Sequence, residues 1–226
     1  APVMAAPAPA PVMAAPVIKA GIKENDLGEL ESMDAKSILN LEKARVIEIL
    51  TEATKDDVLR LGAEKSENLI RVVGNMDMKN VSSAKLKNFV EILSEDQISK
   101  LEPETVMELA NSLEKSDLKA LGKSKTLRML KEIVSDGNSN VDNNVLLKAV
   151  DSLEGASVEE IDKKDLFRLI KIFEDDQLDV LDQKLGPAAI KNIDSESLSG
   201  LPDEKSLFLI KQFSVSTKGD LTKDTA

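Results

Sequence analysis

The stretch KLKNFVEILSEDQISKLEPE (85–104) contains the complete pattern from which the fold is predicted. Its first half places apolar residues at helical spacing as far as Leu93. Ser94 then stands at an N-cap position, and Gln97 follows at the spacing of a capping box. Pro103 stands where the first turn of a further helix tolerates a missing N–H. The stretch therefore predicts an amphipathic helix, a shorter helix and the start of a third.

The same apolar pattern returns at fixed intervals along the chain, with partial matches at an offset of 40. At an offset of 80, Leu86, Phe89, Val90, Ile98 and Leu101 align with Leu166, Leu169, Ile170, Leu178 and Leu181. At an offset of 20, Phe89, Val90, Leu93, Ile98 and Leu101 align with Leu109, Ala110, Leu113, Leu118 and Leu121. The basic unit is therefore about 20 residues long.

Start and stop signals for helices agree with this interval. In TVMELANSLEKSDLKALGKSK (105–125), Ser116 is predicted to start a helix and Gly122 to end one. Helices this short are marginal alone, so they must stack to bury their apolar faces. We predict an all-α fold, an α-solenoid-like array of short helices with repeats of about 20 residues grouped at 40 and 80. The alternative is a plain helical bundle whose amphipathic pattern mimics repeats.

The alternation of short helices also resembles two known folds. In LSEDQISKLEPETVMEL (93–109) it is similar to the short-helix superhelices of the bacterial flagellar motor switch protein and of the cytoplasmic N-domain of magnesium channels. The resemblance implies a right-handed superhelical fold. It includes no motif that indicates a function.

Composition divides the chain into three segments. Residues 1–17 form an Ala/Pro-rich extended segment in which APVMAAP occurs twice, residues 18–214 form the helical repeat domain, and residues 215–226 form a polar tail or an atypical last repeat. Aromatic residues make up 2 % of the chain, all of them Phe, which is typical of packed small helices and not of a β-sandwich.

Charge and residue usage argue against several functions. The net charge is −11 and no cluster of Lys and Arg is present, so neither a nucleic acid nor an anionic membrane is an expected partner. No apolar run approaches the ~20 residues of a membrane-spanning helix. Without His, Cys or Tyr the usual catalytic bases and nucleophiles are missing. We predict no enzymatic activity and no cofactor.

One stretch, SDGNSNVDNN (135–144), has a partial metal-binding pattern. Asp136, Asn138, Asn140 and Asp142 alternate as oxygen ligands do in a calcium loop. Val141 replaces the glycine that such a loop needs, and Leu147 replaces its bidentate glutamate. An Asn-rich connecting turn is the competing interpretation.

The N-terminal segment is predicted to bind something, because a free Ala/Pro segment buries too little surface to become ordered. Val3 and Met4 recur as Val12 and Met13, a separation of about 28 Å in polyproline geometry. We expect these four residues to act as a two-point strap, in the groove of the same chain, on another copy or on a larger complex. An Ala/Pro expansion without a role is the alternative.

The sequence as a whole predicts a structural protein. We expect a scaffold or accessory subunit that binds protein partners through its repeat surface and its strap. A self-assembling filament or surface-layer-like lattice subunit is the first alternative, and a calcium-dependent regulator or an enzyme built around 135–144 is the second. The Ala/Pro start favours a mature chain left after removal of a targeting peptide, without deciding the compartment.

Overall fold

The computed structural model describes residues 22–74, 78–135, 141–153, 161–174, 177–178, 199–207 and 209–210. Within these residues the backbone forms helices and no strand, which confirms the predicted all-α class for the described part. The predicted N-terminal strap and C-terminal tail lie outside it.

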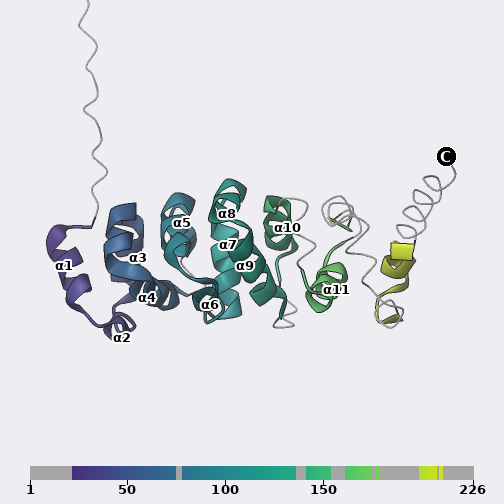
Figure 1. Ribbon diagram of the computed structural model, residues 1–226, viewed down its shortest axis with the longest axis horizontal. Coiled ribbons are helices and arrows are strands. Elements are labelled where there is room, and N and C mark those ends of the chain that lie inside the picture. Colours follow the sequence, from purple (N-terminus) through teal and green to yellow (C-terminus); the bar gives the residue numbers. More distant parts are fainter. Residues whose placement is uncertain are drawn as a thin grey trace, which may run out of the picture.

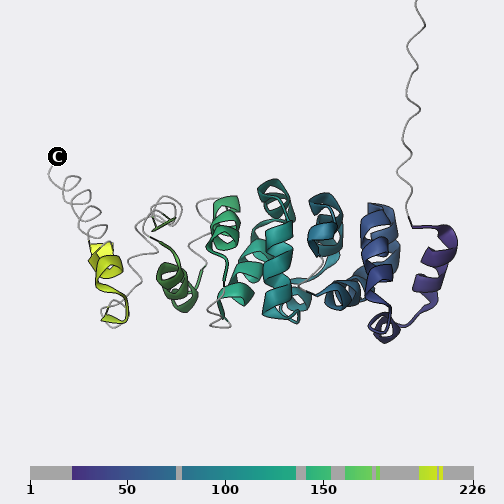
Figure 2. The same ribbon diagram turned by 180° about the vertical axis from the view of Figure 1, so that it is seen from behind.

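The described helices lie in a row along the long axis of the molecule, from α1 at one end towards α11 (Figure 1), and the view from behind shows the same order (Figure 2). They are α1 (Glu24–Ser32), α2 (Ala35–Ile38), α3 (Lys43–Glu52), α4 (Lys55–Val73), the 3-10 helix η1 (Met78–Asn80), α5 (Ser83–Ile92), α6 (Glu95–Ile98), α7 (Pro103–Ser112), α8 (Lys115–Leu121), α9 (Lys123–Ser135), α10 (Asn143–Ser152) and α11 (Lys163–Ile172). Helices pack against elements near them in the chain: α4 contacts α1, α2, α3 and α5, and α9 contacts α6, α7, α8, α10 and α11.

Local signals define most helix ends as the sequence predicts. Ser94 and Gln97 form the predicted capping box at the start of α6, and Pro103 occupies the first turn of α7. The prediction for Ser116 is wrong, because α8 begins at Lys115 with Glu114 as its N-cap. The reason is a tertiary contact: the Glu114 backbone N–H donates to the Ser83 Oγ at 2.7 Å, which fixes the turn ahead of Ser116.

Two glycines allow one helical segment to follow another without a linker. Gly62 has φ +80° and divides α4 into two helical segments, and Gly122 has φ +86° between α8 and α9. Residues with a side chain rarely adopt this backbone conformation, so glycine is required at both sharp turns.

The core is a column of apolar side chains that runs the length of the row. Helices α5, α7, α9, α10 and α11 begin at evenly spaced positions, namely Ser83, Pro103, Lys123, Asn143 and Lys163. One position in each such interval is at most 2 % exposed: Leu30, Leu50, Ile70, Val90, Ala110, Leu130, Val150 and Ile170. The buried positions therefore follow the interval seen in the sequence.

Several lysine side chains connect their own helix to the end of an earlier one. Lys65 reaches the carbonyls of Leu30 and Glu31, Lys85 those of Glu52 and Ala53, Lys125 those of Val90 and Glu91, and Lys148 those of Asn111 and Leu113. These four are called the bracing lysines below. Lys205 donates in the same way to the carbonyl of Lys171 in α11.

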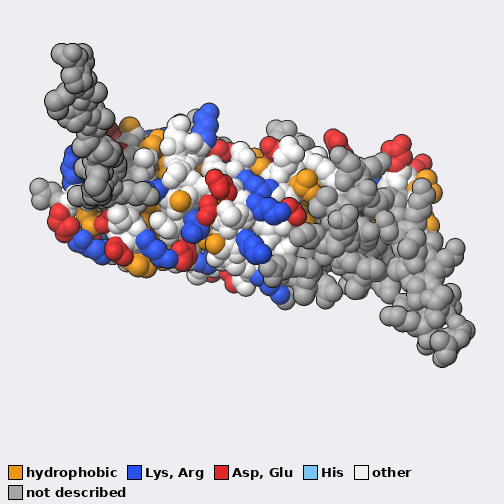
Figure 3. All heavy atoms as spheres, turned by 90° about the horizontal axis from the view of Figure 1, so that it is seen from above, with side chains coloured by type: hydrophobic (Ala, Val, Ile, Leu, Met, Phe, Trp, Pro, Cys, Tyr) orange, Lys and Arg blue, Asp and Glu red, His pale blue; other side chains and the backbone are white. Residues whose placement is uncertain are grey.

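Each bracing lysine meets the C-terminal end of a helix. There the last carbonyls have no partner within the helix, and the helix dipole favours a positive charge. The contact brings the ammonium group close to packed protein, and this burial lowers the pKa of Lys125 and of Lys148. The lysines donate to carbonyls at helix ends and fix how successive helices stack; of these carbonyls, that of Val90 also accepts from the Leu93 backbone N–H. Seen from above, the remaining described surface carries interspersed positive and negative side chains (Figure 3).

Two hydroxyl groups at equivalent positions of the column differ in hydrogen bonding. The Ser66 side chain is fully buried and its Oγ has no partner in the described part of the chain, whereas the Thr126 hydroxyl donates to the Leu118 carbonyl at 3.0 Å. Leu86 and Val106 fill the corresponding positions of α5 and α7.

Removing these hydroxyls should have opposite effects. Ser66→Ala removes an unpaired buried hydroxyl and should raise the free energy of unfolding by about 1 kcal/mol. Thr126→Val removes a paired hydroxyl at nearly constant volume and should lower that free energy by about 1 kcal/mol. Urea unfolding followed by circular dichroism measures both. Equal effects of the same sign would show that the hydrogen bonding of these two groups is not as described.

Candidate functional site

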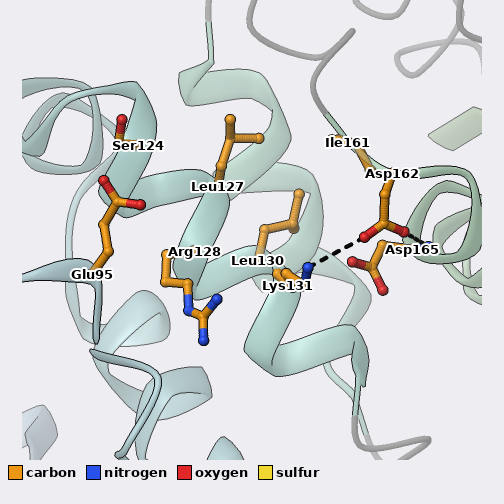
Figure 4. A pocket seen from close by; sticks show the side chains of 9 residues that line it. All are labelled: Glu95, Ser124, Leu127, Arg128, Leu130, Lys131, Ile161, Asp162 and Asp165. Carbon is orange, nitrogen blue, oxygen red and sulfur yellow. Dashed lines mark hydrogen bonds and ion pairs between the residues drawn. The ribbon is translucent and has the colours of Figure 1, made fainter. Parts of the chain in front are cut away.

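A cavity of about 200 Å³ lies between α9 and the start of α11, beside α6 (Figure 4). Its lining residues are Glu95, Ser124, Leu127, Arg128, Leu130, Lys131, Ile161, Asp162 and Asp165. The three apolar side chains form part of its wall, and the carboxyl groups of Asp162 and Asp165 lie together on one side (Figure 4). It therefore combines an apolar wall with a concentrated negative charge.

The cavity lies at one of the positions where the series of lysines is interrupted; Thr105 and Val145 are others. Lys85 and Lys125 are separated by 40 residues, and 40 residues beyond Lys125 the chain has Asp165. Lys125 meets the carbonyls of Val90 and Glu91, and the residues 40 positions beyond those, Leu130 and Lys131, line the cavity. An aspartate is shorter than a lysine and has the opposite charge, so it leaves this space unfilled.

Hydrogen bonds at the start of α11 hold the two aspartates in place. Asp162 is the N-cap of α11, and its Oδ1 accepts from the Asp165 backbone N–H at 3.0 Å. The Nζ of Lys131 lies 3.3 Å from the Asp162 Oδ2. The Asp165 side chain is only 7 % exposed, and its Oδ1 lies 3.5 Å from a terminal nitrogen of Arg168.

The two carboxyl groups differ in pKa because their surroundings differ. The hydrogen bond from the Asp165 backbone N–H, with help from Lys131, lowers the pKa of Asp162. Burial raises the pKa of Asp165, and the negative charge of Asp162 raises it further. Asp165 is therefore a carboxylate whose charge is only partly compensated by the protein.

The cations that line the cavity have partners of their own. Arg128 pairs with Glu132 at 2.8 Å, and in Figure 4 its guanidinium points away from the two aspartates. Lys131 pairs with Asp162. Glu95 makes no ion pair with another described residue, whereas Asp165 has a long contact with Arg168 and a side-chain hydrogen bond with Asp162. The cavity is thus suited chemically to a positively charged group with an apolar stem.

Most residues predicted as sites lie outside the described part of the chain. Val3, Met4, Val12 and Met13 of the strap do so, as do Asp136, Asn138 and Asn140 of the calcium candidate. Asp142 is described: it is the N-cap of α10 and accepts from the Asn144 backbone N–H at 2.9 Å. No group of three or more metal-ligating side chains is found in the described ranges. Both predictions stay predictions.

Sequence reasoning missed Asp165, although the sequence contains a signal for it. At intervals of 20, residues 65, 85, 125 and 205 are lysine, residues 105, 145 and 185 are uncharged, and residue 165 is the only acidic member of the series. The series has no obvious meaning until the structure shows that its lysines reach carbonyls of earlier helices.

Two exposed leucines mark a second surface, at the α1 end of the row. Leu39 follows α2 and is 47 % exposed, and Leu59, which lies 20 residues later in α4, is 56 % exposed. Helices α2 and α4 are in contact, so the two leucines belong to neighbouring elements. At the next two positions of this series the chain has the polar residues Lys79 and Ser99. The leucines therefore form an apolar exception on a charged surface.

No protein-family model matches the chain, and no curated protein or solved structure is significantly similar to it. The resemblance to the motor switch protein and the channel domain accordingly stays a prediction. In the described part of the chain, no helix is both long enough and apolar enough to cross a bilayer.

Removing the charge of Asp165 should stabilise the protein at neutral pH. The folded state raises the pKa of Asp165 above its value in the unfolded chain. Above the raised pKa the ionised carboxylate therefore lowers the free energy of unfolding. This cost disappears as the pH falls below the pKa of Asp165 in the unfolded chain. Asp165→Asn should therefore raise the urea midpoint at pH 7, and the gain should shrink towards pH 4.5.

Asp96→Asn is a control for which the change in stability at neutral pH should have the opposite sign. Lys100 lowers the pKa of Asp96, so this carboxylate contributes stability at neutral pH that is lost on acidification. Urea midpoints of both variants, measured between pH 7 and pH 4.5, test the assignment. A loss of stability in Asp165→Asn at pH 7 would contradict the burial of an ionised, weakly compensated carboxylate.

Proposed function

We propose that this protein is a non-catalytic structural subunit, an α-solenoid-like scaffold that binds protein partners. The observation that carries the proposal is the set of lysine contacts that join successive helices along one row. Contacts of this kind make each unit depend on its neighbours, which is how repeat arrays build long surfaces from short helices.

The constant interval of 20 residues between the buried positions of the column supports the repeat architecture. Stacked units of this length would produce a single buried column with one member in each interval. Each helix alone is too short to be stable. In this interpretation, two consecutive units form one turn of the array. The contacts of α4 and α9 with elements on both sides agree with such stacking.

Surface features support protein as the partner class. The charge of −11 favours association with basic surfaces, and Leu39 and Leu59 supply an exposed apolar contact at one end of the row. The strap at residues 1–17, with Val3, Met4, Val12 and Met13 as its contact residues, is proposed as a second contact. Extended Pro-rich segments bind at low entropic cost because their freedom is already small.

The oligomeric state separates a foreign partner from another copy of this chain. Light scattering should be measured on the full chain and on a form that lacks residues 1–17. A foreign partner predicts a monomer of 24.5 kDa for the full chain and no change in association on truncation.

An oligomer or polymer that dissociates when residues 1–17 are removed would contradict binding to a foreign partner. It would instead make the strap a link between copies and the protein a self-assembling subunit. A variant with Met4 and Met13 both replaced by Ser serves as the matched control, because it keeps the length and the prolines of the strap.

A further inference from the structure

We infer that the cavity between α9 and α11 is a socket for a single lysine side chain presented by a partner protein. The inference rests on the proposed function, because it names a chemical group by which the scaffold would recognise its partner. Its support comes from the cavity's shape, its charges and the chain's own use of lysine at equivalent positions.

The size and wall of the cavity suit one long side chain. About 200 Å³ is somewhat more than the 150 Å³ that holds a benzene ring in an apolar protein cavity. Leu127, Leu130 and Ile161 provide an apolar wall. Lysine stems regularly pack along such surfaces while the ammonium group reaches polar atoms beyond them.

The carboxylates that line the cavity select a cation. Asp165 is buried, with a single ion-pair contact at 3.5 Å, and Glu95 lies across the cavity from it in Figure 4. Lys131 and Arg128 do not fill this role, since they pair with Asp162 and Glu132. An incoming ammonium group would compensate the Asp165 charge, which the protein itself leaves only partly balanced.

The contacts of Lys125 in this chain indicate which side chain would fit the cavity. At the same register, two units earlier, Lys125 extends from the start of α9 to the end of α5. At 165 the chain supplies a carboxylate in place of the ammonium group. The carbonyls of residues 130 and 131 lie inside α9, which continues to Ser135, so the Asp165 carboxylate replaces free carbonyls as the main acceptor.

Binding of a minimal probe tests the inference directly. The probe is Nα-acetyl-lysine methylamide, titrated into the full-length protein and followed by ¹⁵N–¹H NMR. We expect saturable shifts at millimolar probe concentration, confined to amides around 124–131 and 161–165. Nα-acetyl-norleucine methylamide, which keeps the stem and lacks the charge, should cause no saturable shift.

Three variants make the test specific. Asp165→Asn should weaken probe binding at least tenfold without unfolding, because loss of this charge is expected to stabilise the protein. Asp165→Lys restores the residue type of the bracing series and should block the socket with its own side chain. Glu104→Gln, at an exposed carboxylate in the first turn of α7, should bind the probe as the wild type does.

Two results would overturn the inference: no saturable shift with the lysine probe, or equal binding to the wild type and to Asp165→Asn. Equal or tighter binding of putrescine would assign the socket to a free amine and would also overturn the choice of a protein side chain. The proposed scaffold function does not depend on these outcomes, because light scattering on the full chain tests it separately.

Discussion

The ammonium group of a lysine placed against the last carbonyls of an earlier helix is the interaction on which this architecture depends. Helices as short as α5 and α7 cannot persist alone in water. Their C-terminal carbonyls need partners, and the bracing lysines supply both a hydrogen bond and a favourable charge. Apolar burial along the column provides the larger share of stability, whereas the braces determine which helices meet.

Both proposed binding features lie where this regularity fails. Asp165 occupies a lysine position, and the result is a cavity with a buried carboxylate that the protein compensates only in part. Leu39 and Leu59 are exposed at a position that is polar in the next two intervals. Exceptions of this kind cost stability or solubility, which is why we propose them as binding features. Leu207 and Ile210 are further exposed apolar side chains.

Much of the fold could be predicted from sequence because its signals are local. The Ser94–Gln97 capping box, Pro103 at the start of α7 and the apolar spacing around Phe89 each depend on a few neighbouring residues. The start of α8 could not be placed from Ser116, because the hydroxyl of Ser83, at the start of α5, fixes that turn. Asp165 could not be recognised as a site residue for the same reason. Its position is informative only once the structure shows that Lys125 reaches the carbonyls of an earlier helix. The strap and the 136–140 candidates lie outside the described residues.

The measurement that tests the repeat architecture most directly compares two internal deletions by denaturant unfolding. Removing residues 83–122 takes out two whole units and joins Ser82 to the start of α9 in register. A stacked array predicts a cooperative transition with unchanged helix content per residue and an m-value reduced in proportion to length. Removing residues 83–112 shifts the register by half a unit and should abolish that transition. If the in-register deletion unfolds the protein as completely as the out-of-register deletion, the chain has one indivisible core and the account is wrong.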